Sequence, residues 1–255
     1  MSELVTGAVP AGGPDIASPV QHRDRFFLCM AGVLLLLALA GFTPTLYLRP
    51  FFDVPAIPAY LYVHGVVMTC WFLWLVLQAS LVAAHRTDIH RRIGIAGLVL
   101  GVAVVIAGSM ASLGVVPRLP VMGMDLETDM AFVSIVVFGN FGSLFAFSIF
   151  LIAAILLRHR PDVHKRLMLF ASFNVVGPAF SRIAYWPVFS WIEEEPLFTL
   201  GMLVLMFSVG VHDLIVRRRF HMATTVGILF TFLALIGAAV IASTEFAHSF
   251  LRGLG

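Results

Sequence analysis

Seven apolar runs, each long enough to cross a bilayer as a helix, follow one another along the chain and are separated by short polar loops. A transmembrane helix needs about 20 consecutive apolar residues, and only helices and closed β-barrels satisfy their backbone hydrogen bonds in hydrocarbon. The alternating segments of roughly ten residues that build a barrel are absent. Apolar residues make up 60% of the chain and charged residues 12%, which excludes a soluble surface. We predict an all-α integral membrane bundle of seven transmembrane helices.

The runs divide the chain into three parts. Residues 1–25 are rich in Gly, Ala, Pro and Ser and are predicted to be a disordered cytoplasmic tail, residues 26–248 the transmembrane domain, and residues 249–255 a short tail. A signal peptide ending near Ala40 is an alternative for the first run, disfavoured because the apolar stretch continues beyond it. The predicted helices are 26–48, 59–84, 93–116, 130–157, 167–190, 197–216 and 223–246.

The basic residues predict the orientation of the bundle. The tail and the loops after the second, fourth and sixth helices carry twelve Lys and Arg residues, whereas the opposite side carries three. Basic loops stay in the cytoplasm, so we place the amino terminus there and the carboxyl terminus outside, in a bacterial-type inner (plasma) membrane. Because these residues flank the membrane, they predict contacts with anionic lipid headgroups and no binding of nucleic acid.

One loop sequence occurs twice. Residues 85–92 and 159–166 both read His-Arg-x-Asp-(Ile/Val)-His-(Arg/Lys)-Arg, and a degenerate copy lies at 217–221. Asp88 and Asp162 immediately precede apolar runs, so we predict that they cap the free amides at helix starts. The basic residues that follow them are predicted to lie at the level of the lipid headgroups.

The histidines near these loops are candidate metal ligands. His90, His164 and His221 occupy matching positions, and His212 lies beside Asp213, about one turn from the end of the sixth helix. A histidine with a carboxylate nearby is a suitable ligand for a metal or haem iron. We predict that His212, with His90 or His164, holds one haem or metal ion at the cytoplasmic side. A structural role, in which each histidine hydrogen-bonds to a carbonyl group, is the alternative.

Four polar residues inside the apolar runs predict a second site. His64 and Gln78 lie on one face of the second helix, and Asn174 and Arg182 lie along one stripe of the fifth. A charge at the depth of Arg182 is costly unless it is paired or hydrated. We predict that these four residues bind a quinone or another small molecule. The alternative is a structural ion pair of Arg182 with acidic residues of the outer side, namely Asp129, Glu245 or the glutamates at 193–195.

Small residues four positions apart predict close helix packing. The third helix has Gly97 and Gly101, with Gly108 on the same face, and the fourth has Gly139 and Ser143. Small side chains let two backbones approach closely in lipid. We therefore expect both helices in the interior of the bundle.

The hairpins that carry His-Arg-Arg-Ile-Gly at 90–94 and His-Lys-Arg-Leu-Met at 164–168, with His64 in the preceding helix, resemble a widespread group of uncharacterised bacterial multi-pass membrane proteins. That resemblance covers the second to sixth helices and implies no activity. Histidines on successive helices are also similar to those of b-type transmembrane cytochromes and haem A synthase, in which paired histidines on neighbouring helices hold haem. This second resemblance implies a b-type haem. The chain departs from it because His64 is the only outer-side histidine within the membrane.

Three functional hypotheses follow, and they differ in whether the protein is an enzyme. The first is a membrane redox or cofactor-binding protein that uses haem, a metal or a quinone. The second is a non-enzymatic transporter, sensor or lipid-binding scaffold, in which Gly177 and Pro178 mark a hinge or a break in the fifth helix. The third is a zinc-dependent membrane hydrolase, which requires several ligands and a water-activating carboxylate at one depth. Its candidate residues are His90, His164, His212 and Asp213.

Overall fold

The computed structural model describes residues 19–52, 54–184, 186, 188, 191 and 194–255. The described chain is helical and contains no strand, which confirms the predicted all-α class. Long helices are joined by short loops, and three short helical turns lie at the ends of α1 and α3. The elements are α1 (Pro19–Phe42), η1 (Thr43–Tyr47), η2 (Arg49–Phe51), α2 (Ala59–Ala83), α3 (Thr87–Leu113), η3 (Val116–Met122), α4 (Met130–Leu156), α5 (Pro161–Ile183), α6 (Glu194–Arg217), α7 (Met222–Ala242) and α8 (Glu245–Arg252).

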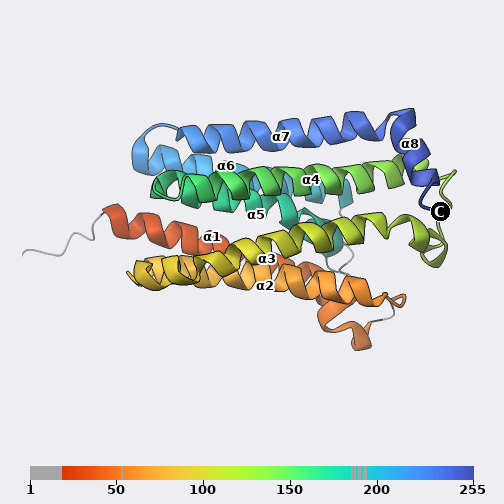
Figure 1. The fold of residues 1–255 in the computed structure, drawn as a ribbon, viewed down its shortest axis with the longest axis horizontal. Helices are drawn as coiled ribbons and strands as arrows, with labels where there is room; N and C mark the ends of the chain where they lie inside the picture. Colours follow the sequence, from red (N-terminus) through yellow and green to blue (C-terminus); the bar gives the residue numbers. More distant parts are fainter. Residues whose placement is uncertain (1–18, 53, 185, 187, 189–190, 192–193) are drawn as a thin grey trace, which may run out of the picture.

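The long helices α1 to α7 lie side by side with their axes roughly aligned (Figure 1). The hairpins α2–α3 and α4–α5 are closely packed pairs, α7 packs on α4, and α1 packs on both α2 and α5. The turns at 84–86, 157–160 and 218–221 all lie at one end of the bundle, at the left in Figure 1, which we call the basic end. Helix α8 and η3 lie at the opposite end.

Within the described residues, six helical segments are long and apolar enough to cross a membrane, so the protein is a multi-pass membrane protein by length and composition. Helix α5 is not among them, because Lys165, Arg166, Asn174 and Arg182 lower its apolar content. Thirteen of its 23 residues are nevertheless buried. The six segments are Arg25–Tyr47, Ala59–Ala83, Thr87–Leu113, Met130–Leu156, Pro196–Arg217 and Met222–Ala242.

The ends of the chain differ from the predicted division. Helix α1 begins at Pro19, so residues 19–25 of the predicted tail are helical, while residues 1–18 lie outside the described part. Helix α7 ends at Ala242, earlier than predicted, because Thr244 starts a new helix by accepting a hydrogen bond from the Ala247 amide at 3.3 Å. Helix α8 therefore covers much of the predicted short tail.

Helix α5 is the centre of the bundle, with α1, α4, α6 and α7 packed around it. Polar side chains fix its position on two sides. Trp71 Nε1 donates to Ser172 Oγ at 3.2 Å, and Asn174 Nδ2 donates to Thr231 Oγ1 at 3.1 Å. The helix continues through Pro178 to Ile183, so it is unbroken at the predicted hinge.

The glycines show where helices approach most closely. A Cβ atom at Gly97 would lie 2.5 Å from Trp74 Nε1, so the small residues of α3 lie on a face that packs closely on α2. Helix α3 itself packs mainly on α2 and α4 and is peripheral, whereas an interior position was predicted. On α4 the close position is Gly142, where a Cβ would lie 2.6 Å from that of Ala238 on α7. Gly139 has open space around its Cβ position, so the contact predicted there is displaced by three residues.

Candidate functional site

The two copies of the repeated loop bring a pair of histidines together at the basic end. His90, in the first turn of α3, and His164, in the first turn of α5, have ring centroids 6.2 Å apart and ring planes at 84°. Hairpins α2–α3 and α4–α5 position them equivalently, since each histidine lies three residues after its helix begins. The structure therefore places together two of the three histidines predicted to be metal ligands.

The hydrogen bond of His164 defines its tautomer. Its Nδ1 lies 2.8 Å from the carbonyl oxygen of Ala154, and a carbonyl oxygen only accepts, so Nδ1 carries the proton. The other nitrogen, Nε2, then has a lone pair. Metal-binding histidines typically donate one ring N–H to a carbonyl group while the second nitrogen binds the metal.

His90 and Gln78 contribute buried polar atoms to the same end of the bundle. The His90 ring interacts with the backbone of Gln78. Nδ1 of His90 and both amide atoms of the Gln78 side chain are buried and have no hydrogen-bond partner among the described residues. Buried polar groups almost always have a partner, so these three atoms make this region a candidate binding site.

The third predicted ligand, His212, lies in a different environment. Its ring stacks on Phe26 at a centroid distance of 4.0 Å and meets the edge of Phe27 at 5.6 Å. Nδ1 of His212 is 3.9 Å from Oδ1 of Asp213. Within the described ranges, no group of three or more His, Cys, Asp or Glu side chains is arranged to hold a metal ion. The three predicted ligands thus form a pair and a separate residue.

The histidine of the degenerate third copy has a structural role. His221 is the N-cap of α7, and its Nδ1 accepts a hydrogen bond from the Ala223 amide at 3.0 Å. Burial, together with the nearby charges of Arg166 and Arg217, lowers the pKa of His221. The neutral ring that accepts this bond is thereby favoured.

An ion pair that the sequence did not predict connects three helices at the basic end. Nε of Arg166 donates to Oδ1 of Asp213 at 3.1 Å, and its Nη2 donates to the same oxygen. Oδ2 of Asp213 accepts from Thr224 Oγ1 at 2.5 Å and from the His221 amide at 3.1 Å. Arg166 is 2% exposed and Asp213 is fully buried, so the pair links α5, α6 and α7 inside the protein.

The structure corrects two predictions made for the repeated loops. Arg166 was expected at the lipid headgroups with its neighbours, but it lies inside the bundle. A carboxylate inside an apolar run requires a cation, and Asp213 was the signal that could have identified this pair. Asp88 and Asp162 do not cap their helices, because the N-caps are Arg86 and Arg160 and neither makes a side-chain cap bond. Both carboxylates lie in the first turn instead and form ion pairs, Asp88 with Arg86 at 3.5 Å and Asp162 with Lys165 at 3.7 Å.

The predicted small-molecule site is spread along the bundle. The Arg182 charge acts on His64, whose ring also interacts with the backbone of Ala107. Arg182 donates to the Pro178 carbonyl at 3.3 Å, and its guanidinium lies 4.6 Å from the centre of the Phe42 ring. These contacts bring His64 and Arg182 into one region away from the basic end. The side chains at 193–195, predicted partners of Arg182, are not among the side chains that the structure describes.

Gln78 and Asn174 lie apart from that region. Gln78 is fourteen residues from His64 on the same helix, which is about 21 Å along the axis. Asn174 donates to the Phe170 carbonyl at 2.8 Å and to Thr231, and its Oδ1 is buried with no hydrogen-bond partner in the described part of the chain. One small molecule therefore does not contact all four residues, and their role in binding stays a prediction.

No family model, curated protein or solved structure matches this chain.

Proposed function

We propose that this chain is a seven-span protein of the inner membrane that holds one haem iron or other transition-metal ion between His90 and His164. The observation that supports the proposal is the pairing of these two histidines, at 6.2 Å between ring centroids, by two copies of one loop sequence. The proposed topology places the amino terminus and the basic end in the cytoplasm, because Lys and Arg accumulate in those loops.

The distance suits a shared metal. His90 and His164 would hold the metal through ring nitrogens, at bond lengths of about 2.0–2.1 Å, and the 6.2 Å between their ring centroids leaves room for one ion. Nε2 of His164 has the lone pair for such a bond, since Nδ1 donates to Ala154. On His90, the buried Nδ1 has no competing hydrogen bond within the described residues.

The number of ligands favours a haem over a zinc hydrolase. A catalytic zinc site uses three protein ligands, whereas a six-coordinate haem iron takes two axial ligands from the protein. The described residues present a pair and no group of three. A bound haem supplies one-electron chemistry, and a buried site lined by helices tunes its potential. The region of His64 and Arg182 would then bind the partner molecule, a quinone or another carbonyl compound.

The test is an oxidised and a dithionite-reduced absorption spectrum of the detergent-purified protein, with elemental analysis of the same sample. We expect a Soret band with sharp reduced bands, or one equivalent of a transition metal. His90→Ala and His164→Ala should each lose the signal. His159→Ala is the matched control, because His159 is exposed and belongs to the same loop as His164. A colourless, metal-free wild-type protein would overturn the proposal.

A different observation favours the second hypothesis, a non-enzymatic transporter or sensor. Buried polar atoms with no hydrogen-bond partner among the described residues lie at several depths, on His64, Gln78 and Asn174. Polar groups at successive depths line pathways through membrane proteins. Proton flux into liposomes containing the protein, measured with a pH-sensitive dye, tests this reading. The flux should fall in Gln78→Leu and stay unchanged in Leu77→Ala, which alters an exposed apolar neighbour.

A further inference from the structure

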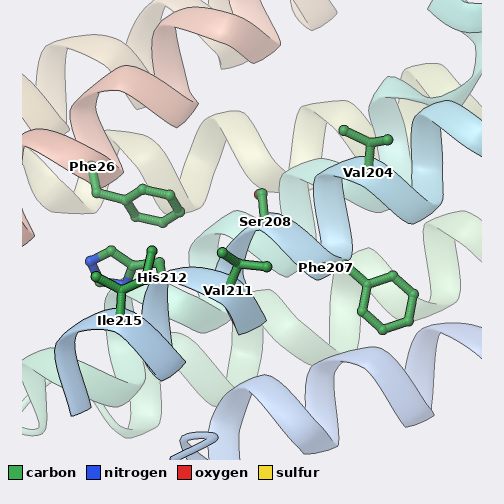
Figure 2. A pocket seen from close by; sticks show the side chains of 7 residues that line it. All are labelled: Phe26, Val204, Phe207, Ser208, Val211, His212 and Ile215. Carbon is green, nitrogen blue, oxygen red and sulfur yellow. The ribbon is translucent and has the colours of Figure 1, made fainter. Parts of the chain in front are cut away.

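An apolar groove runs along the outside of α6 near the basic end (Figure 2). Val204, Phe207, Val211 and Ile215 follow one another at helical spacing and form its floor, while Phe26 of α1 lies beside it. The groove has a volume of about 470 Å³. Its α6 residues remain open to the surroundings, since Val211 is 53% and Ile215 68% exposed.

The lining of the groove suits a hydrocarbon chain. The two polar residues along it are Ser208 and His212. Ser208 Oγ already donates to the Leu205 carbonyl at 2.7 Å, and both nitrogens of His212 are buried. A ligand with polar groups would lose hydrogen bonds to water on entering this groove and gain few in return. A saturated chain has no such groups to satisfy.

Exposed cations lie close in the sequence to two residues that line the groove. Arg25 directly precedes Phe26, and Arg218 and Arg219 follow Ile215 within four residues. All three arginines are exposed, whereas Arg217 pairs with Asp162 at 3.5 Å. Basic residues beside an apolar surface at a helix end recognise anionic lipid headgroups.

From the groove and these cations together, we infer a binding site for one anionic phospholipid, with an acyl chain along α6 and the phosphate on Arg25, Arg218 and Arg219. This lipid site requires no cofactor, so the inference does not depend on metal or haem binding by His90 and His164. It differs from general contact with the bilayer because chain and headgroup are held at one defined place.

Native mass spectrometry of the detergent-purified protein tests the site with two lipids that share acyl chains, phosphatidylglycerol and phosphatidylcholine. Wild type should retain one phosphatidylglycerol and release phosphatidylcholine. Val211→Trp fills the groove and should abolish the adduct. Ile95→Trp is the matched control, since Ile95 is also an exposed apolar residue, on α3. Equal melting temperatures of the two variants would show that the loss does not arise from unfolding.

The headgroup contact is tested separately. The double variant Arg218→Gln/Arg219→Gln should bind phosphatidylglycerol about thirtyfold more weakly, since each basic residue near an anionic headgroup contributes about a factor of five. Arg91→Gln/Arg92→Gln removes the same charge near the start of α3, also at the basic end, and should bind as wild type does. The inference is overturned if Val211→Trp keeps the adduct or phosphatidylcholine binds equally. It is also overturned if a neutral quinone, and not a phospholipid, is extracted from wild type and is absent from Val211→Trp.

Discussion

The buried ion pair between Arg166 and Asp213 should make Asp213 one of the residues on which the bundle depends most. Asp213→Ala removes the acceptor of three donors: the Arg166 guanidinium, the Thr224 hydroxyl and the His221 amide. Removing one partner of a buried pair costs about 3–5 kcal/mol, because the other charge stays buried and unpaired. At roughly 2–4 °C per kcal/mol for a chain of this size, the melting temperature should fall by about 10 °C.

The assay is thermal unfolding of the detergent-purified protein, followed by circular dichroism. Asp88→Ala is the control, because Asp88 pairs with Arg86 at the surface, where an ion pair contributes at most about 1 kcal/mol. Asp213→Asn keeps an acceptor for Thr224 and His221 but leaves the Arg166 charge unpaired. Adding Arg166→Met to Asp213→Asn removes that charge, so the double variant should be more stable than Asp213→Asn alone.

The reasoning is refuted by either of two results. One is a fall in melting temperature for Asp213→Ala no larger than that for Asp88→Ala. The other is a double variant whose destabilisation equals the sum of its two single changes, since independent sites add and coupled charges do not.

Two further predictions concern α4, α7 and α8. Gly142→Ala should destabilise the bundle by about 1–3 kcal/mol because its Cβ would overlap α7, whereas Gly139→Ala should be nearly neutral; thermal unfolding compares the two. Arg252 donates two hydrogen bonds to Glu127, at 2.8 and 3.0 Å, and these bonds lower the pKa of the Glu127 carboxyl. The ion pair therefore stabilises the fold fully above the ordinary pKa of a glutamate. This stabilisation is lost as the pH falls through the lowered pKa of Glu127 in the folded protein. We expect α8 amides to exchange hydrogen more slowly in wild type than in Arg252→Gln at neutral pH. That difference should vanish once the pH falls below the lowered pKa of Glu127, and a difference that persists when Glu127 is protonated contradicts the role of this pair.

The positions of the helices were predictable because apolar runs and loop residues are local features of the chain. Helix α2 was predicted at 59–84 and runs from Ala59 to Ala83, and α4 was predicted at 130–157 and runs from Met130 to Leu156. The start of α3 was predicted six residues late. Basic residues at 91 and 92 were assigned to a loop, although arginine is a good helix former and continues the helix into the headgroup region.

Which residues meet in the candidate site depends on which helices are neighbours in the bundle. The sequence alone carries little information about these neighbours. The predicted ligand pair was His212 with His90 or His164, whereas the structure brings together His90 and His164, which stand at equivalent points of the repeated loop. The same repeat was misleading for the last residue of the motif. Arg166 is buried against Asp213, whereas Arg92 at the matching position is exposed, because α5 is central and α3 peripheral.

The position of α5 has a consequence for how the protein is made. A segment leaving the ribosome enters the bilayer by itself only if its own side chains favour lipid, and polar or charged side chains along it oppose this. Helix α5 is less apolar than the other long helices, which are apolar enough to cross a membrane, yet it forms the centre of the bundle. On the proposed seven-span topology it must therefore enter together with α4, as a hairpin, and settle against α1, which is already in the membrane. Helices α1, α4 and α5 would then assemble first. They would provide the surface on which α6 and α7 pack afterwards.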